Sequence, residues 1–343
     1  MSKEVYIGVN STARKIKAIF IGVNGVARKV ATGFIGVNGV ARLFFQATPD
    51  YVSGQYQSCV TNVGYIYVSN DFGITWTQKG ISESWKAISI SSDGKYQTAC
   101  VYNGYIYRSS DYGATWSQGT TWSQVGLSDR WQSVSLSSNG QYQTACSYSG
   151  YIYRSIDYGN IWSLVYTSNY FISVALSDSG QYQTVCGYNN QPLFKSSDYG
   201  MNWSTVGLSK SWNDVCVSSN GMYQTAVVNE GYIYRSSDYG TTWSQVGLSK
   251  NWRSVAMSSN GKYQTAVLSG GTVYVSSDYG VTWGAVYITS AVWCSVRVSA
   301  DGKYQCAVPE GSIGIFIESS DYGVTWKEYS SAAKYIVQIA MNR

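Results

Sequence analysis

The strongest constraint on the fold is a short motif that recurs seven times along the chain. The copy at residues 236–243 reads SSDYGTTW, and every copy has a Gly two residues after its Asp and a Trp five residues after it. The Asp positions, which lie 40 to 46 residues apart, are Asp71, Asp111, Asp157, Asp198, Asp238, Asp278 and Asp321. A period near 40 residues with one turn motif per period is typical of β units repeated around an axis.

Each copy lies between two strand-like runs. Residues 232–235 (YIYR) precede the motif and residues 243–246 (WSQV) follow it, and both runs are rich in aromatic or β-branched residues. An Asp side chain accepts hydrogen bonds from backbone N–H groups further along a turn, and Gly adopts the positive φ that a tight turn needs. We therefore expect each motif to form a hairpin turn, with its Trp packing at the start of the next strand.

The pattern Ser-x-Asp-x-Gly-x-Thr-Trp resembles the Asp-box (BNR) repeat. This repeat is found in sialidases, in some plant-polysaccharide hydrolases, in sortilin-type receptors and in the photosystem II assembly-factor propeller. The resemblance covers roughly residues 55–343 and implies a β-propeller, but it does not imply one activity. Because the box is a peripheral folding element in that family, we interpret the seven Asp residues as structural; a metal-binding or catalytic role is the alternative.

A second repeat, Gly-x-Tyr-Gln, also occurs seven times. Between residues 252 and 283 a full unit contains three strand-like runs and the start of a fourth. Seven such units predict an all-β, seven-bladed propeller with four-stranded blades. Pro49 and Asp50 spoil a first strand for the first unit, so we expect residues 335–341 (YIVQIAM) to supply it and close the ring, which removes open sheet edges.

The first 45 residues carry a different repeat, with a period of 14 residues. Asn24-Gly25 and Asn38-Gly39 are strong signals for two-residue turns, so each copy is predicted to form a small hairpin. These hairpins resemble repeats in structural proteins of bacteriophages and related virus-like particles. We therefore divide the chain into a stem at 1–45 and a propeller at 46–343, with Arg14, Arg28 and Arg42 as candidate docking residues. A solvated basic arm and a nucleic-acid-binding arm remain alternatives.

Charge is concentrated in the stem. Residues 1–45 carry seven basic residues and one acidic residue, whereas the rest of the chain carries 17 basic and 18 acidic residues. A nucleic-acid-binding patch on the propeller is therefore not expected. The start of the chain has no signal-peptide pattern, and no apolar run reaches the 18 residues of a membrane span. The seven Cys residues are expected to be free thiols, which favours assembly in the cytoplasm.

The propeller face opposite the Asp boxes is the expected position of a site. An aromatic residue follows each turn on this face and is predicted to ring the central opening, with two lysines nearby. Stacking on sugar rings would make these residues a carbohydrate site; packing between blades is the alternative reading. The candidates are Trp85, Trp131, Tyr170, Trp212, Trp252, Trp293, Lys210 and Lys250.

An enzymatic function is not expected. The chain has no His, which excludes a Ser-His triad and a His-ligated metal. A sialidase would need an Arg-Ile-Pro motif, but Arg-Ile precedes none of the three Pro residues. A glycosidase usually needs two carboxylates across a cleft, and nothing pairs the few acids expected near the open face. These acids are Glu83, Asp129, Asp214, Glu230 and Glu310. We predict no catalytic residue, metal or cofactor.

Together these features predict a non-enzymatic structural or binding protein on the surface of a phage-like particle. The stem would bind other structural proteins of the particle, and the propeller would bind a cell-surface glycan or protein receptor. Neither membrane insertion nor nucleic-acid binding is expected. An intracellular scaffold propeller that binds proteins is the alternative, and a glycoside hydrolase of the Asp-box class is the third reading.

Overall fold

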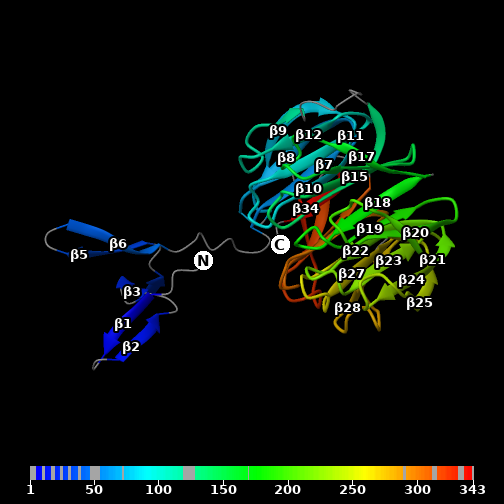
Figure 1. Ribbon diagram of the computed structural model, residues 1–343. Helices are drawn as coiled ribbons and strands as arrows, with labels where there is room; N and C mark the ends of the chain where they lie inside the picture. Colours follow the sequence, from blue (N-terminus) through cyan, green and yellow to red (C-terminus); the bar gives the residue numbers. More distant parts are fainter. Residues whose placement is uncertain are drawn as a thin grey trace. The chain divides into compact units, whose positions relative to one another are not determined.

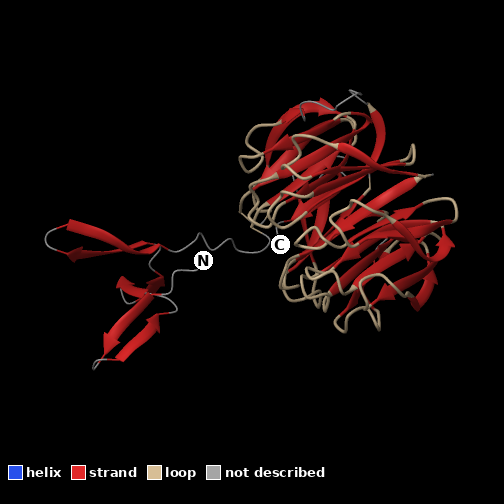
Figure 2. Cartoon of the chain, viewed as in Figure 1, coloured by secondary structure: helices blue, strands red, loops and turns tan. Residues whose placement is uncertain are grey.

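The computed structural model divides the chain into two units, Met1–Val52 and Ser53–Arg343. The sequence places this boundary at residue 45. Of residues 1–54, the structure describes only the backbone of six strands. It further describes residues 55–71, 73–118, 128–168, 170–288, 291–310, 315–330 and 336–341. Figure 2 shows strands and loops, and no helix, in these described parts.

The first unit contains three two-stranded sheets, one in each 14-residue repeat. In the second and third sheets, Val23 faces Val26 and Val37 faces Val40 across the Asn-Gly pairs, as those pairs predict. The strands are β1 (Val5–Val9), β2 (Thr12–Ile16), β3 (Phe20–Val23), β4 (Val26–Lys29), β5 (Thr32–Val37) and β6 (Val40–Gln46).

The second unit is a ring of seven four-stranded antiparallel blades (Figure 1). The first strand of every blade contacts the first strands of both neighbouring blades, so these seven strands surround a central channel. They are β34 (Ile336–Met341), β10 (Trp85–Ile90), β14 (Asp129–Leu136), β18 (Phe171–Leu176), β22 (Trp212–Val217), β26 (Trp252–Met257) and β30 (Trp293–Val298).

The second strands are fully buried. They are β7 (Gln57–Thr61), β11 (Gln97–Gly104, buried except at Tyr102 and Asn103), β15 (Gln143–Ser147), β19 (Gln183–Gly187), β23 (Gln224–Val228), β27 (Gln264–Leu268) and β31 (Gln305–Pro309). The third strands are β8 (Gly64–Ser69), β12 (Ile106–Ser109), β16 (Tyr151–Ser155), β20 (Gln191–Ser196), β24 (Gly231–Ser236), β28 (Thr272–Ser276) and β32 (Ile315–Ser319).

The outer strands are mostly exposed where their side chains are described. They are β9 (Thr77–Glu83), β13 (Ser117–Gln118), β17 (Ser163–Thr167), β21 (Ser204–Lys210), β25 (Ser244–Lys250), β29 (Gly284–Ile288) and β33 (Lys327–Ser330). The six-residue near-duplication that follows Trp116 falls largely at 119–127, outside the described residues.

The C-terminal strand closes the ring as the sequence predicts. β34 pairs antiparallel with β7, with Ile336 opposite Thr61 and Met341 opposite Gln57. The first blade therefore takes its inner strand from the end of the chain and its other three strands from the start of the propeller. All seven cysteines are free, and six of them are buried.

The Asp box forms the predicted hairpin turn between the third and fourth strands. The Asp238 carboxylate accepts hydrogen bonds from the Ser236 hydroxyl (2.7 Å), the Thr242 amide (2.9 Å) and the Thr242 hydroxyl (2.7 Å). The Trp243 indole donates to the Gly240 carbonyl at 3.1 Å. A Cβ on Gly240 would lie 2.6 Å from the Gln224 side-chain oxygen, and φ there is +73°, so the turn requires glycine on two counts.

Neighbouring blades are also tied together below the boxes. Tyr239 of one box stacks on Tyr182 of the preceding blade, with ring centroids 4.6 Å apart. Further in, the Thr225 hydroxyl donates to the side-chain oxygen of Gln264 in the next blade at 2.7 Å. A Ser or Thr makes this bond at six junctions, to Gln97, Gln143, Gln183, Gln224, Gln264 and Gln305.

The seventh junction is different because Cys306 occupies the position of the Thr. There, Gln57 interacts instead with Glu318 on β32. Burial raises the pKa of Glu318 from its ordinary 4.5 to about 7, against the opposing effect of the hydrogen bond with Gln57. The closing seam of the ring therefore holds a carboxyl group that favours its protonated form.

Candidate functional site

The predicted aromatic ring is buried between the blades. Trp252 is 0% exposed, and its indole donates to the Leu248 carbonyl of the preceding blade at 3.2 Å. The indoles of Trp85, Trp131 and Trp212 likewise donate to backbone carbonyls of the preceding blades. Trp85, Trp131, Trp212, Trp252 and Trp293 are all at most 2% exposed. This burial favours packing, the alternative weighed for these residues, over stacking on a ligand.

The sixth predicted aromatic, Tyr170, lies elsewhere. Phe171 occupies the buried position equivalent to the Trp residues, at 0% exposed. Tyr170 precedes it with a φ of +55°, is 39% exposed, and stacks on Tyr148 with ring centroids 5.0 Å apart. Tyr170 therefore belongs to an exposed tyrosine pair and not to the packing ring.

The lysine and arginine candidates do not lie at the opening. Lys210 and Lys250 are the last residues of the outer strands β21 and β25, and neither lines the hollows described below. Arg14, Arg28 and Arg42 lie opposite Ile7, Ile21 and Ile35 in the three hairpins. Their side chains fall outside the described residues, so their docking role stays a prediction.

A β-bulge recurs in all seven inner strands, always directly after the packing residue. In β26, for example, the register shifts between Trp252 and Ser254, which leaves Arg253 as the extra residue. A bulge changes the direction in which side chains point, so consecutive residues can face the same side. Both Arg253 and Ser254 accordingly line the channel. We call the extra residues the bulge residues; those with described side chains are Lys86, Gln132, Ile172, Asn213, Arg253 and Cys294.

The bulge residues line a hollow of about 470 Å³ on the channel face away from the Asp boxes. A neighbouring hollow of about 290 Å³ shares Gln132, Tyr148, Ile172, Asn213 and Arg253 with it. We call the two together the funnel. Its rim is aromatic over blades two to four (Tyr102, Tyr148, Tyr188) and polar elsewhere (Asn62, Asn229, Asn251, Ser269, Glu310). The funnel lies within the size range of small-molecule sites.

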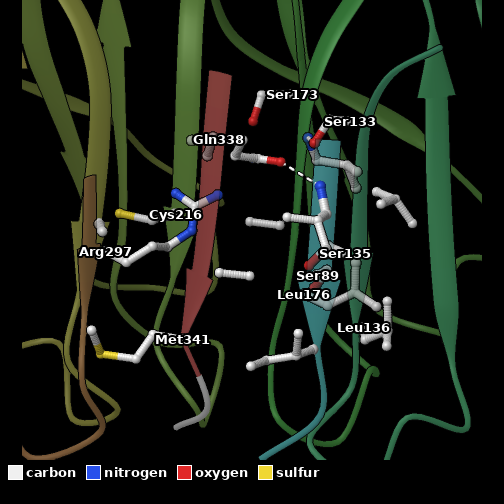
Figure 3. Close-up of a pocket in the computed structure, with 18 of the residues that line it drawn as sticks. Ser89, Ser133, Ser135, Leu136, Ser173, Leu176, Cys216, Arg297, Gln338 and Met341 are labelled. Atoms are coloured by element: carbon white, nitrogen blue, oxygen red, sulfur yellow. Dashed lines mark hydrogen bonds between the residues drawn. The ribbon is translucent and has the colours of Figure 1, made fainter. Parts of the chain in front are cut away.

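Polar side chains below the bulge residues tie the inner strands together. The Ile88 amide donates to the Gln338 side-chain oxygen at 2.6 Å, and the Val174 amide donates to the Ser133 hydroxyl at 3.3 Å. Figure 3 shows these side chains at the upper end of the lower channel, above Arg297 and Met341. The hollow in this lower part measures only about 100 Å³. The funnel is therefore the roomy end of the channel.

Two carboxylates that the sequence marks as near the open face, Asp214 and Glu310, do line the funnel. Asp214 is held by four donors: the hydroxyls of Ser173 (2.7 Å) and Ser254 (2.8 Å) and the amides of Val215 (2.9 Å) and Val255 (3.0 Å). These bonds join three blades and occupy both carboxylate oxygens. Asp214 thus has a structural role in the belt around the channel.

Two cations in the funnel were missed by the sequence reasoning, Lys86 and Arg253. Burial and then the Arg253 charge lower the pKa of Lys86. Burial also raises the pKa of Cys294 to about 12, so that this thiol is neutral near pH 7. The signal available in the sequence was the residue after each inner Trp, which differs from blade to blade. Within the described part of the chain, no group of three or more Cys, Asp or Glu side chains could hold a metal ion.

Comparison with known proteins gives a family repeat and a fold. The BNR-Asp box repeat matches residues 66–79 and 233–246. No curated protein matches the chain. Among the described residues no helix is both long enough and apolar enough to span a membrane.

The similar solved structures include two of YCF48 and one GH74 enzyme. YCF48 from Cyanidioschyzon merolae is 15% identical over 78% of this chain and 89% of its own, with a TM-score of 0.58. YCF48 bound to D1 peptide is 16% identical over 78% and 88%, with a TM-score of 0.54. An ancestral GH74 enzyme is 14% identical over 84% of this chain but only 40% of its own, with a TM-score of 0.58.

At these identities the likeness extends to the fold alone, and it gives no support to the phage or virus resemblance of the stem. The chain is a β-propeller built from BNR/Asp-box repeats, and it resembles the YCF48 and GH74 propellers in fold.

Proposed function

We propose that this propeller is a non-catalytic glycan-binding module whose site is the funnel. The observation that carries the proposal is the division of the funnel wall. Tyrosine rings and Ile172 line one side, while the amides of Asn213, Asn229 and Asn251 line the other. Aromatic faces suit the C–H faces of sugars and amides suit their hydroxyls, and few convergent polar groups in a partly apolar hollow are typical of ligand sites.

The absence of a catalytic role follows from how the funnel acids are used. A glycosidase needs one carboxyl to transfer a proton and a second to act as base or nucleophile. Asp214 accepts four hydrogen bonds within the belt, which leaves Glu310 as the other acid lining the funnel among the described residues. The fold likeness to a GH74 enzyme makes polysaccharide hydrolysis the competing enzymatic reading. Release of reducing ends from a panel of β-glucans, lost in Glu310→Gln, would support it.

The test is a glycan array probed with the labelled full chain. Tyr102→Ala removes a funnel tyrosine that is 40% exposed. Tyr322→Ala is the matched control, because Tyr322 is 43% exposed in an Asp box on the opposite face. We expect specific binding that Tyr102→Ala weakens at least tenfold and Tyr322→Ala leaves unchanged. Absence of glycan binding by the folded wild type, or equal loss in both variants, would refute the proposal.

Attachment of the stem to a phage-like particle remains a second proposal. It rests on the three repeated hairpins and on the basic charge of residues 1–45. The full chain should co-sediment with particles from its source, and a chain lacking residues 1–45 should not. A fold shared with YCF48, one of whose structures is bound to a peptide, keeps a protein-binding scaffold as the alternative. Co-sedimentation of both chains, or of neither, would argue against the stem as the attachment segment.

A further inference from the structure

The funnel contains two cations that come from separate blades. Lys86 is the bulge residue of β10 and Arg253 is the bulge residue of β26, and both line the same hollow. Their charges interact, because Arg253 lowers the pKa of Lys86. Two like charges held this close in a partly buried hollow are unfavourable unless an anion compensates them.

The acids of the funnel do not supply that compensation. Both oxygens of Asp214 are occupied by donors from Ser173, Ser254 and two backbone amides. Glu310 attracts the Lys86 charge, but more weakly than Arg253 repels it. Cys294 is neutral because its pKa is raised to about 12. Among the described residues, neither Lys86 nor Arg253 forms a hydrogen bond or an ion pair.

The other basic side chains near the channel have partners. Arg130 lies over the Tyr148 ring at 5.3 Å, and the Arg297 guanidinium donates to the Val296 carbonyl at 2.7 Å. Lys86 and Arg253 thus stand out as cations with hydrogen-bonding capacity left over. Arg in particular offers a planar fork of donors that matches a carboxylate or sulfate.

We propose that Lys86 and Arg253 together bind an oxyanion of the ligand, so that the funnel selects acidic glycans. This inference rests on the proposed glycan-binding function and names the class of glycan. The carboxylate or sulfate lies between the two cations, while the sugar ring contacts Tyr148 and Ile172 and its hydroxyls reach Asn213 and Gln132. Burial of the pair strengthens the attraction, because the hollow screens charges less than bulk water does.

The test measures the affinity of the full chain for three tetrasaccharides by calorimetry. Tetragalacturonate carries carboxylates, a heparin-derived tetrasaccharide carries sulfates as well, and neutral galactotetraose is the uncharged counterpart. We expect at least one acidic tetrasaccharide to bind tenfold or more tightly than galactotetraose, with affinity falling as NaCl increases. Comparison of the two acidic probes then identifies the preferred oxyanion.

Variants locate the effect. Lys86→Met and Arg253→Met should each weaken the acidic probe at least tenfold and leave neutral binding unchanged. Lys210→Met and Lys250→Met, which remove the same charge outside the funnel, should change neither. Arg253→Lys should recover part of the loss. Unchanged melting temperatures would show that Lys86→Met and Arg253→Met are folded, as expected from removing a partly buried charge.

The outcomes separate the two proposals. Equal affinity for neutral and acidic probes, still weakened by Tyr102→Ala, would refute the oxyanion site while leaving glycan binding intact. Failure of every tetrasaccharide and of the array would refute both. Binding of hexaglutamate but of no glycan, lost in the same variants, would also refute an acidic-glycan ligand and would assign the cations to an acidic peptide.

Discussion

The Asp box and the bulge residue each occur once per blade, and they differ in how much they vary. The boxes at 236–243 and 276–283 read SSDYGTTW and SSDYGVTW, with the same hydrogen bonds around the Asp. The bulge residues with described side chains are a Lys, a Gln, an Ile, an Asn, an Arg and a Cys. The fold thus requires the first element to be constant and leaves the second free to carry a site.

Removal of a packing Trp should have the largest effect on stability. Trp252→Ala deletes a side chain that is 0% exposed between two blades, so we expect a loss of about 3–5 kcal/mol in the free energy of unfolding. Denaturant unfolding followed by circular dichroism measures it. The adjacent Arg253→Met serves as the control and should lose less than about 1 kcal/mol. A loss for Trp252→Ala no greater than that of the control would contradict the packing role.

An Asp-box substitution should have an intermediate effect. Asp238→Ala leaves the Thr242 amide and two hydroxyls without their charged acceptor, so we expect a loss of about 1–3 kcal/mol. The same unfolding measurement applies. Ligand affinity should not change in the folded variant, because the box lies on the other face. A loss of affinity at unchanged stability would show that the boxes take part in binding.

The two kinds of carboxyl group should give stability opposite dependences on pH. Hydrogen bonds from the Thr325 hydroxyl and amide lower the pKa of Asp321 from 3.8 to about 2, so its contribution is complete above pH 4 and is lost as the pH falls through 2. Glu318, with its pKa raised to about 7, binds its proton more tightly in the folded state. Its contribution is present below pH 4.5 and is lost as the pH rises to 7.

Melting temperatures from pH 4.5 to 7.5 test the Glu318 part of this prediction. The wild type should lose stability toward the upper end, and Glu318→Gln should flatten the profile while keeping the side-chain shape. Asp93→Asn, at an acid of the inner turn of another blade, is the control and should leave the slope unchanged. Identical profiles for the wild type and Glu318→Gln would mean that the seam carboxyl has no unusual pKa.

The smallest effects are expected at the lysines that end the outer strands. Lys210→Ala and Lys250→Ala remove side chains that do not line the funnel, so stability should change by less than about 0.5 kcal/mol and glycan affinity should not change. Thermal melts and the glycan array together measure both quantities. A clear loss of affinity in either variant would extend the site beyond the funnel.

Repetition made the fold predictable from sequence. Asp238, Gly240 and Trp243 define a turn by local chemistry, and the register of seven copies fixes the blades. The strand at 336–341 was predictable because its pattern matches the other inner strands. Local chemistry and periodicity are both written in the chain, so neither needs long-range information.

The site was less predictable because side-chain direction depends on the bulge. Strict alternation along a strand would not place both Arg253 and Ser254 on the channel side, and the sequence alone does not reveal the register shift between Trp252 and Ser254. One extra residue before β18 likewise led to Tyr170 being chosen in place of Phe171. Pairing of Lys86 with Arg253 needed the closed ring, because 167 residues separate them in sequence (253 minus 86).

The most direct test of the central claim is a crystal structure of the full chain with tetragalacturonate. We predict sugar density in the funnel, with a carboxylate between Lys86 and Arg253 and a ring against Tyr148. Density at the Asp-box turns, or an empty funnel at a concentration that saturates binding in solution, would show that the variable bulge residues do not form the binding site.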